Sequence, residues 1–226
     1  MIYGLLLVMA SIHPVERPST PPARCAVKES IGRCVSFKFE RPAAVVPAYT
    51  ISVRDDGLLH YWAGDLPEGK EESSLPSLSA SPAALKKVFD AVPFISTTGC
   101  ETHSKNIANT GKKVLLAYSG DEVRECVFNY SDEEKLNAAA SAFQAIAETI
   151  QAGDRLKHKH RFDHLGLDAE LDSLLSAAKG GFAIELQNIA PILQSIVDDD
   201  EMMSPDRRKA KSLIEMVNVQ AASSAR

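Results

Sequence analysis

The sequence has no apolar run long enough to cross a membrane as a helix, which takes about 20 residues. Its most apolar stretch covers only residues 1–10 and ends at Ala10. The small residues at Val8 and Ala10 fit the pattern before a signal-peptidase cut, although the stretch has no Lys or Arg. We therefore expect a signal peptide at 1–10 and, after its cleavage, no integral membrane span.

A concentrated basic surface is also lacking. The formal net charge is -5, the pI is about 5.7, and aromatic residues make up only 6% of the chain. Proteins that bind nucleic acids or anionic membranes usually carry a basic stripe. We expect no nucleic-acid partner.

Several motifs that identify enzymes are missing. The chain has no glycine-rich phosphate loop, no G-x-S-x-G, no H-E-x-x-H and no EF-hand loop. Its cysteines do not form the C-x-x-C pairs of a zinc site. These absences favour a non-catalytic protein without a cofactor, and they leave an enzyme as an alternative.

The chain contains four cysteines, Cys25, Cys34, Cys100 and Cys126. In an exported protein four cysteines form up to two disulfides, with three connectivities. We favour Cys25–Cys34 and Cys100–Cys126, because the members of each pair are close in sequence. In a cytosolic protein they would instead be buried thiols.

The first part of the chain divides into an extended tether and a series of strands. Residues 11–32 contain four prolines and predict a tether. From residue 33 apolar residues alternate with polar ones, as in a half-buried strand. Asp56-Gly57 predicts a hairpin turn, and Ser119-Gly120-Asp121 predicts a second one. Ser81-Pro82 predicts the start of a short helix.

A long amphipathic helix is predicted over residues 131–153, with Ser131 and Glu134 as a capping box and Gly153 as its end. Such a helix is expected to cover one face of an antiparallel sheet. The predicted fold class is α+β: two hairpins plus an extra strand, packed by the long helix, with a helical C-terminal part. The expected divisions are an α+β domain at 33–153, a polar connector and helices at 154–219, and a disordered tail at 220–226. Further helices are expected at 168–179 and 182–198, with a kink at Pro191, and from Ser204 to Val219.

Residues 49–64 (YTISVRDDGLLHYWAG) and 81–94 (SPAALKKVFDAVPF) carry a resemblance to a known family. Over roughly residues 33–130 the chain resembles a bacterial secreted domain family of unknown function. There a strand, an Asp-Gly turn and a return strand precede a capped helix. The resemblance implies an exported α+β module and no known activity.

Three groups of residues are candidates for chemistry or binding. His158, His160 and His164, with nearby aspartates, are metal-capable and would suit zinc or copper. Solvated connector histidines are the favoured interpretation, so we assign no metal ligand. Residues 96–104 include Cys100 and His103, a nucleophile and base pair, but the disulfide is the better use of Cys100. Trp62 is interpreted as core, with an exposed ligand anchor as the alternative.

The leading functional hypothesis is a periplasmic or secreted, non-catalytic binding module that contacts a protein or a cell-envelope ligand. One alternative is a hydrolase or metal-dependent enzyme with its site near Cys100–His103 or His158–His164. Convergence of those two segments in one pocket would favour the enzyme. The other alternative is a helical protein-interaction unit in residues 165–219, which predicts an apolar patch on those helices.

Overall fold

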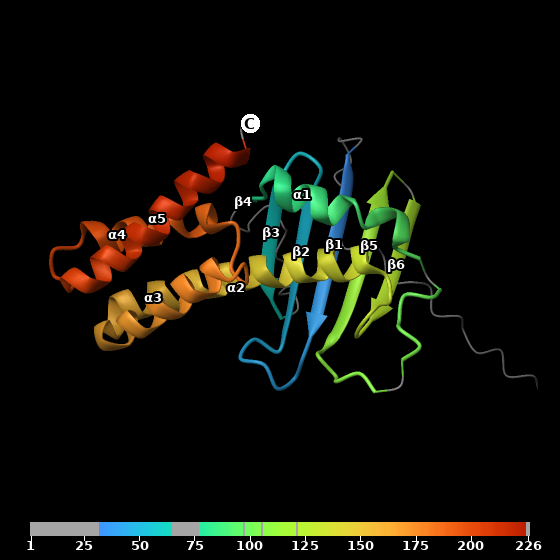
Figure 1. Cartoon of the computed structure of the whole chain (residues 1–226), viewed down its shortest axis with the longest axis horizontal. Coiled ribbons are helices and arrows are strands. Elements are labelled where there is room, and N and C mark those ends of the chain that lie inside the picture. Colours follow the sequence, from blue (N-terminus) through green and yellow to red (C-terminus); the bar gives the residue numbers. More distant parts are fainter. Residues whose placement is uncertain (1–31, 65–76, 97, 105, 121, 225–226) are drawn as a thin grey trace, which may run out of the picture.

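Six antiparallel strands form one sheet, in the order β4-β3-β2-β1-β5-β6 (Figure 1). The computed structural model describes residues 32–64, 77–96, 98–104, 106–120 and 122–224, and side chains as far as Val219. The strands are β1 (Arg33–Glu40), β2 (Ala48–Arg54), β3 (Leu58–Ala63), β4 (Leu78–Ser79), β5 (Lys112–Ser119) and β6 (Glu122–Phe128).

The central strand β1 confirms the period-two prediction. Val35, Phe37 and Phe39 point into one core and are at most 6% exposed. Phe37 lies opposite Ile51 of β2 on one side and Leu115 of β5 on the other. Alternate side chains of a strand point to opposite faces, so this register places one apolar row in the core.

Both predicted hairpins are present. β2 and β3 are joined at Gly57, whose φ of +90° suits a residue without a Cβ. The Leu58 amide donates to Asp56 Oδ1 at 3.1 Å and closes this turn. β5 and β6 form the second hairpin. The short strand β4 is additional to the two hairpins and the extra strand that the sequence predicts.

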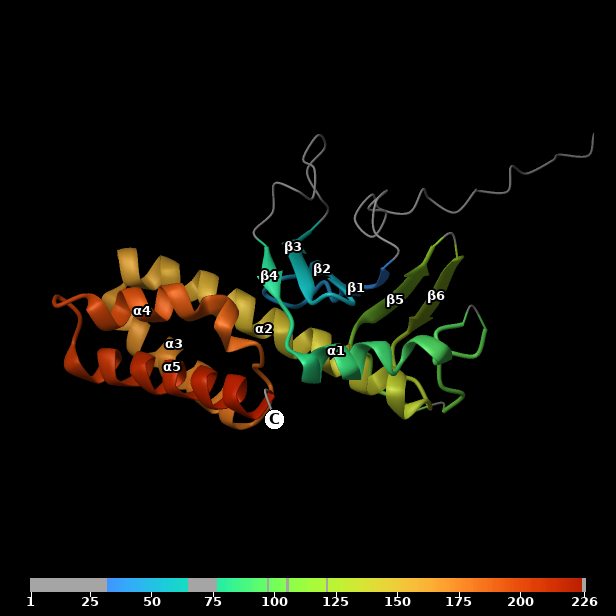
Figure 2. The same ribbon diagram turned by 90° about the horizontal axis from the view of Figure 1, so that it is seen from above.

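Two helices cover the same face of the sheet (Figure 2). Helix α1 (Pro82–Phe89) begins as predicted, with the Ala84 amide donating to Ser81 Oγ at 3.3 Å. The first half of α2 (Glu134–Phe162) places Phe143 on Phe37, with parallel rings 5.1 Å apart. The predicted α+β class, with a long helix on an antiparallel sheet, is confirmed.

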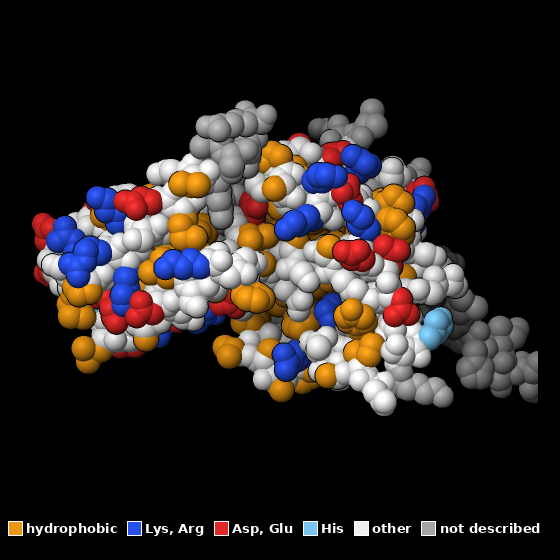
Figure 3. All heavy atoms as spheres, viewed as in Figure 1, with side chains coloured by type: hydrophobic (Ala, Val, Ile, Leu, Met, Phe, Trp, Pro, Cys, Tyr) orange, Lys and Arg blue, Asp and Glu red, His pale blue; other side chains and the backbone are white. Residues whose placement is uncertain are grey.

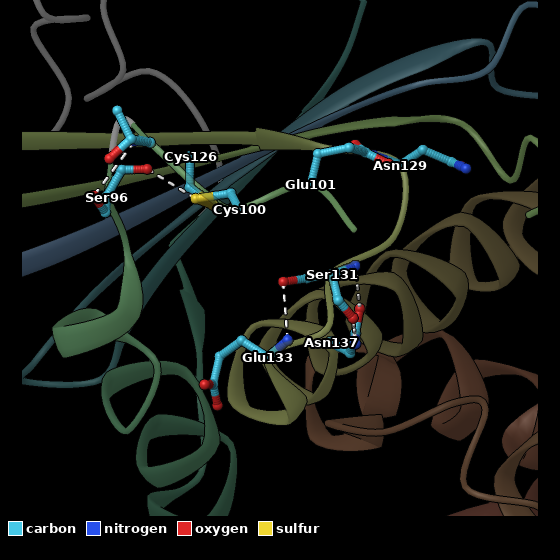
Figure 4. Close-up of a disulfide and its surroundings, with 9 residues drawn as sticks. Ser96, Cys100, Glu101, Cys126, Asn129, Ser131, Glu133 and Asn137 are labelled. Carbon is cyan, nitrogen blue, oxygen red and sulfur yellow. Dashed lines mark hydrogen bonds between the residues drawn. A yellow bond between two sulfur atoms is a disulfide. The ribbon is translucent and has the colours of Figure 1, made fainter. Parts of the chain in front are cut away.

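The start of α2 differs from the predicted capping box. Glu133 is the N-cap, and its side chain accepts from the Lys135 amide at 3.1 Å. Ser131 lies before the helix, where its Oγ accepts from the Glu133 amide (Figure 4). Asn137 Nδ2 donates to the Ser131 carbonyl at 2.6 Å. Ser131 therefore shapes the approach to the helix and does not cap it.

The predicted end of the long helix at Gly153 is wrong, because α2 continues to Phe162. A glycine inside a helix costs about 1 kcal/mol relative to alanine. Leu156, on the next turn, is fully buried, and burying a leucine contributes about 1.5–3 kcal/mol. Packing thus outweighs the local preference of glycine.

Gly153 is also where another segment comes closest to α2. A Cβ at this position would lie 2.4 Å from Ile189 Cγ2. Ile189 ends the short 3₁₀ helix η3 (Leu186–Ile189) and is 5% exposed. The missing side chain of Gly153 leaves room for Ile189.

The second half of α2 belongs to a separate helical core. Ala152 and Leu156 pack with residues of three further helices, including Leu171, Leu193 and Leu213. These helices are α3 (His164–Lys179), α4 (Ala190–Asp198) and α5 (Ser204–Ser224). One helix therefore supplies residues to both cores (Figure 1).

Two details of the helical part differ from the sequence-based expectation. The predicted helix at 182–198 is divided: Phe182 is 73% exposed, and α4 begins with Pro191 in its first turn. Proline fits there because its missing N–H is not needed, so Pro191 starts a helix and does not kink one. Helix α5 extends past Val219 to Ser224, into the segment predicted to be disordered.

Cys100 and Cys126 form a disulfide, as predicted. It joins the segment before β5 to strand β6. Cys34 is buried on β1. Its predicted partner Cys25 lies outside the described residues, as do the predicted signal peptide at 1–10 and the tether as far as residue 31. Among the helices that the structure describes, none combines the length and apolar character needed to cross a bilayer.

Gly153→Ala should lower the free energy of unfolding by about 1–2 kcal/mol, because overpacking against Ile189 exceeds the gain in helix propensity. In an Ile189→Ala background the same change should raise stability by up to about 1 kcal/mol. Urea unfolding of the four proteins of this cycle measures both effects. The same sign in both backgrounds would contradict the close approach.

Replacing Cys100 and Cys126 together with alanine should lower the free energy of unfolding by about 3 kcal/mol, the typical effect of a disulfide that closes a loop of this size. The two cysteines are 26 residues apart. Urea unfolding under oxidising conditions measures the loss. A loss below about 1 kcal/mol would show that the disulfide contributes little.

Candidate functional site

The three predicted metal-capable histidines have separate contacts. His158 contacts Phe162 within α2, with the two rings tilted and 5.2 Å between their centroids. His160 Nε2 lies 2.9 Å from Asp199 Oδ2, and His164 Nε2 lies 2.9 Å from the His160 carbonyl oxygen. Within the described residues, no group of three or more His, Cys, Asp or Glu side chains is placed to hold a metal ion. His160 and His164 thus connect the end of α2 to the residues after α4 and to α3.

The polar segment at 96–104 holds the end of β6. Cys100 is in the disulfide and has no thiol for a dyad with His103. The Asn129 amide donates to Glu101 Oε2 at 2.6 Å (Figure 4). Thr102 Oγ1 donates to Asp132 Oδ1. This segment lies near the start of α2, whereas the histidines lie at its far end (Figure 1). The two segments do not converge in one pocket.

The helical-unit alternative predicts an apolar patch on residues 165–219. Leu165, in the first turn of α3, is 87% exposed, and Phe162, the last residue of α2, is 65% exposed. Phe182 is exposed elsewhere in the helical part. Single exposed apolar residues are common on protein surfaces, so these residues do not identify a partner.

Charges are mixed on the face that carries α1 and α2. Lys and Arg side chains there alternate with Asp and Glu, without a field of one sign (Figure 3). Such a face does not favour a polyanionic partner.

Trp62 is buried, with 7% exposure, so it is not an exposed anchor. It lies on β3, where Leu59 and Tyr61 point to the helix-covered face and Trp62 to the other. Trp62 also lines a cavity at the edge of the sheet. Trp62 is therefore a buried residue at the margin of this cavity.

The cavity has a volume of about 420 Å³ and lies between the sheet edge and the helical core. The middle of α2 forms one wall, β3 and β4 a second, and η3 with the start of α4 a third. Small-molecule pockets commonly enclose about 300–1,000 Å³. The described lining residues are Tyr61, Trp62, Ala63, Leu78, Ile150, Gly153, Asp154, Lys157, Asn188, Ile189, Pro191 and Ile192.

Two opposite charges lie at the rim of this cavity, three residues apart on α2. Desolvation beside the apolar wall raises the pKa of the Asp154 carboxyl, although the residue is exposed at the rim. The positive charges of Lys157 and Arg155 lower the pKa of this carboxyl and so partly oppose the effect of desolvation. Among the described residues, neither Asp154 nor Lys157 has a hydrogen-bond or ion-pair partner at contact distance. Both charges are available to a ligand.

Other polar groups at the cavity hold its walls together. The Ser79 amide of β4 donates to Asn188 Oδ1 at 2.8 Å, and Asn188 Nδ2 donates to the Ser79 carbonyl at 2.9 Å. Gln151 Nε2 donates to the Tyr61 hydroxyl at 3.0 Å. Burial raises the pKa of Tyr61, so this hydroxyl stays neutral at physiological pH. These side chains hold the walls of the cavity together.

The wall next to η3 is fixed by Glu185, which is 4% exposed and has a φ of +64°. Its carboxylate accepts from the Ser81 amide at 2.7 Å and from the Ser81 hydroxyl at 2.6 Å. Thr149 Oγ1 donates to the carbonyl of Ile184, the residue before Glu185, at 2.6 Å. The segment before η3 is therefore bonded to both α1 and α2.

Sequence reasoning missed this site. Its signal was the spacing of Ile150, Asp154 and Lys157, which share a helix face only if the helix continues through Gly153. The described lining residues include one carboxylate, one amine, one phenol and one amide, and they contain no nucleophile and base in contact. The arrangement is suited to binding.

Asp154→Asn should make the protein more stable at neutral pH. The folded pKa of Asp154 is raised above its ordinary 3.8, so ionisation destabilises the native state as the pH rises from about 3.8 through the folded value. The stability difference between variant and wild type should shrink on acidification below that window. Urea unfolding between pH 3 and 8 measures it, with Glu215→Gln, an exposed change on α5, as control. An equal difference at every pH would contradict the assignment.

No family model matches the sequence, and no curated protein matches it. The resemblance of residues 33–130 to a secreted family stays a prediction, and the function must be argued from the cavity and its surroundings.

Proposed function

We propose that the protein is a non-catalytic binding module of the cell envelope that holds a small, mainly apolar molecule with a zwitterionic end in the junction cavity. The observation that carries the proposal is the cavity between the two cores, with apolar walls and two opposite rim charges. Concave, largely apolar sites with a few convergent polar groups are typical of ligand pockets.

The walls indicate an apolar body for the ligand. Trp62, Ile189 and Ile192 line the cavity together with other apolar residues. Burying an alkyl group against such walls contributes about 0.8 kcal/mol per methylene. A chain of six to eight carbons would therefore supply most of the affinity.

The rim indicates the charged end. Desolvation raises the pKa of the Asp154 carboxyl group. An ammonium group next to it would stabilise the ionised carboxylate. A carboxylate or phosphate on the same molecule would meet Lys157. A zwitterion satisfies both side chains, whereas a simple amine or a simple acid satisfies one and is repelled by the other.

The location in the envelope is supported by two features. Disulfides such as Cys100–Cys126 persist in oxidising compartments. Residues 1–10 fit a signal peptide.

Mass spectrometry of the protein from its native host would report cleavage after Ala10, and an intact N-terminus in the cytosol would contradict export.

Three eight-carbon probes test the ligand class: 2-aminooctanoate, octylamine and octanoate. The zwitterion should bind most tightly, and Asp154→Asn or Lys157→Gln should each weaken it about fivefold, as expected for an exposed ion pair of about 1 kcal/mol. The chain has a single tryptophan, Trp62, which is among the residues that line the cavity, so its fluorescence is followed as each probe is added. Calorimetry gives the affinities.

Two variants control this experiment. Lys179→Gln, at the exposed end of α3, should leave binding unchanged. Ile192→Phe should fill the cavity and abolish binding without lowering the melting temperature by more than a few degrees. Equal affinity for all three probes, or no binding of any at millimolar concentration, would overturn the proposed function.

A further inference from the structure

We propose that the outer edge of β6 binds an extended segment of another protein, in which a Lys or Arg lies between two apolar residues at alternate positions. This surface is at the opposite end of the sheet from the cavity. It is independent of the proposed small-molecule site.

The backbone of β6 is open on one side. β6 is the last strand of the sheet and pairs with β5. Throughout the part of the chain that the structure describes, no other strand pairs with it. An edge strand presents a row of unpaired N–H and C=O groups. An extended peptide can bond to these groups and add a new strand to the sheet.

The positions whose backbone points outward can be assigned. Ser119 and Glu122 close a two-residue hairpin loop as a directly opposed pair, so Glu122 bonds to β5 and the outward positions are Val123, Glu125 and Val127. The Asn129 amide continues this alternation, because it bonds away from β5 to Glu101.

The side chains at the outward positions define the partner. Val123 and Val127 are each 45% exposed, and Glu125 between them is also exposed. All three lie on the sheet face opposite the helices, because Cys126 and Phe128 point into the core. A strand laid on this edge would place its alternate side chains next to a valine, a carboxylate and a valine.

A hollow beside the edge supports a basic side chain at the middle position. It encloses about 460 Å³ and is lined by Gly99, Cys100, Glu101, Glu125 and Val127. Two of these five residues carry carboxylates, and no described cation lines the hollow. A Lys or Arg of the bound segment would lie opposite Glu125 and reach toward Glu101.

The edge is held in a fixed shape. The disulfide joins Cys126 to Cys100, and Glu101 accepts the Asn129 amide, so the loop that forms the hollow is tied to β6 at two points (Figure 4). A preformed edge loses little conformational entropy on binding.

A second copy of this chain fits the edge less well. Antiparallel pairing of two β6 strands that uses all three outward positions centres on Glu125. It would put Glu125 directly opposite Glu125 of the other copy, and like charges in this position are unfavourable. A basic partner removes that repulsion, which is why the proposal commits to a heterologous segment.

The capped peptide Thr-Val-Thr-Lys-Thr-Val-Thr tests the proposal on the full chain labelled with ¹⁵N. Its Lys would lie opposite Glu125. Addition of the peptide should slow amide hydrogen exchange at Val123, Glu125 and Val127, and the same peptide with Glu in place of Lys should bind at least about fivefold more weakly. Glu125→Lys should reverse the preference between the two peptides. Glu215→Lys, the same charge reversal at an exposed position of α5, is the matched control and should change neither affinity.

Three results would overturn the proposal. Equal binding of the Lys and Glu peptides would show that charge does not select the partner. Unchanged exchange at millimolar peptide would show that the charged edge only prevents non-specific pairing. Slowed exchange that rises with protein concentration, without peptide, would assign the edge to a second copy of the chain.

Discussion

The structure depends on one continuous helix that is buried in two cores. Helix α2 has 29 residues, so it is about 43 Å long at 1.5 Å per residue. Phe143 in its first half packs on the sheet, and Leu156 in its second half packs among the C-terminal helices. Because a helix is stiff, this shared element sets how far apart the two cores lie. The cavity exists because both cores leave a space where the helix passes between them.

Short polar contacts then fix the two cores around that space. Glu185 binds the start of α1, Asn188 binds β4, and Thr149 of α2 binds the carbonyl of Ile184. The left-handed backbone of Glu185 costs of the order of 1–3 kcal/mol, and its two charge-assisted hydrogen bonds to Ser81 offset this cost. Through these hydrogen bonds the segment 184–189 connects α2 to α1 and to the edge of the sheet. A cavity with walls joined in this way is preorganised, which favours binding.

The two proposed surfaces use different physical means at opposite ends of the sheet. At the β3–β4 end, burial of apolar area would supply affinity, and Asp154 and Lys157 would select the polar end of a ligand. At the β6 end, backbone hydrogen bonds would supply affinity, and Glu125 with Glu101 would select a basic residue. The disulfide at Cys126 rigidifies the β6 edge. The close approach of Gly153 and Ile189 shapes the cavity.

Local patterns in the sequence determined the strands, the turns and the existence of the long helix. The alternation at Val35, Phe37 and Phe39 and the Asp-Gly turn are set by neighbours within a few residues, so they could be predicted. The end of α2 could not, because the preference of Gly153 is small beside the burial of Leu156 against residues far along the chain. Asp154 and Lys157 became rim residues only through that continuation and through the approach of Ile189. Those contacts join segments distant in sequence, so tertiary structure alone decided the cavity.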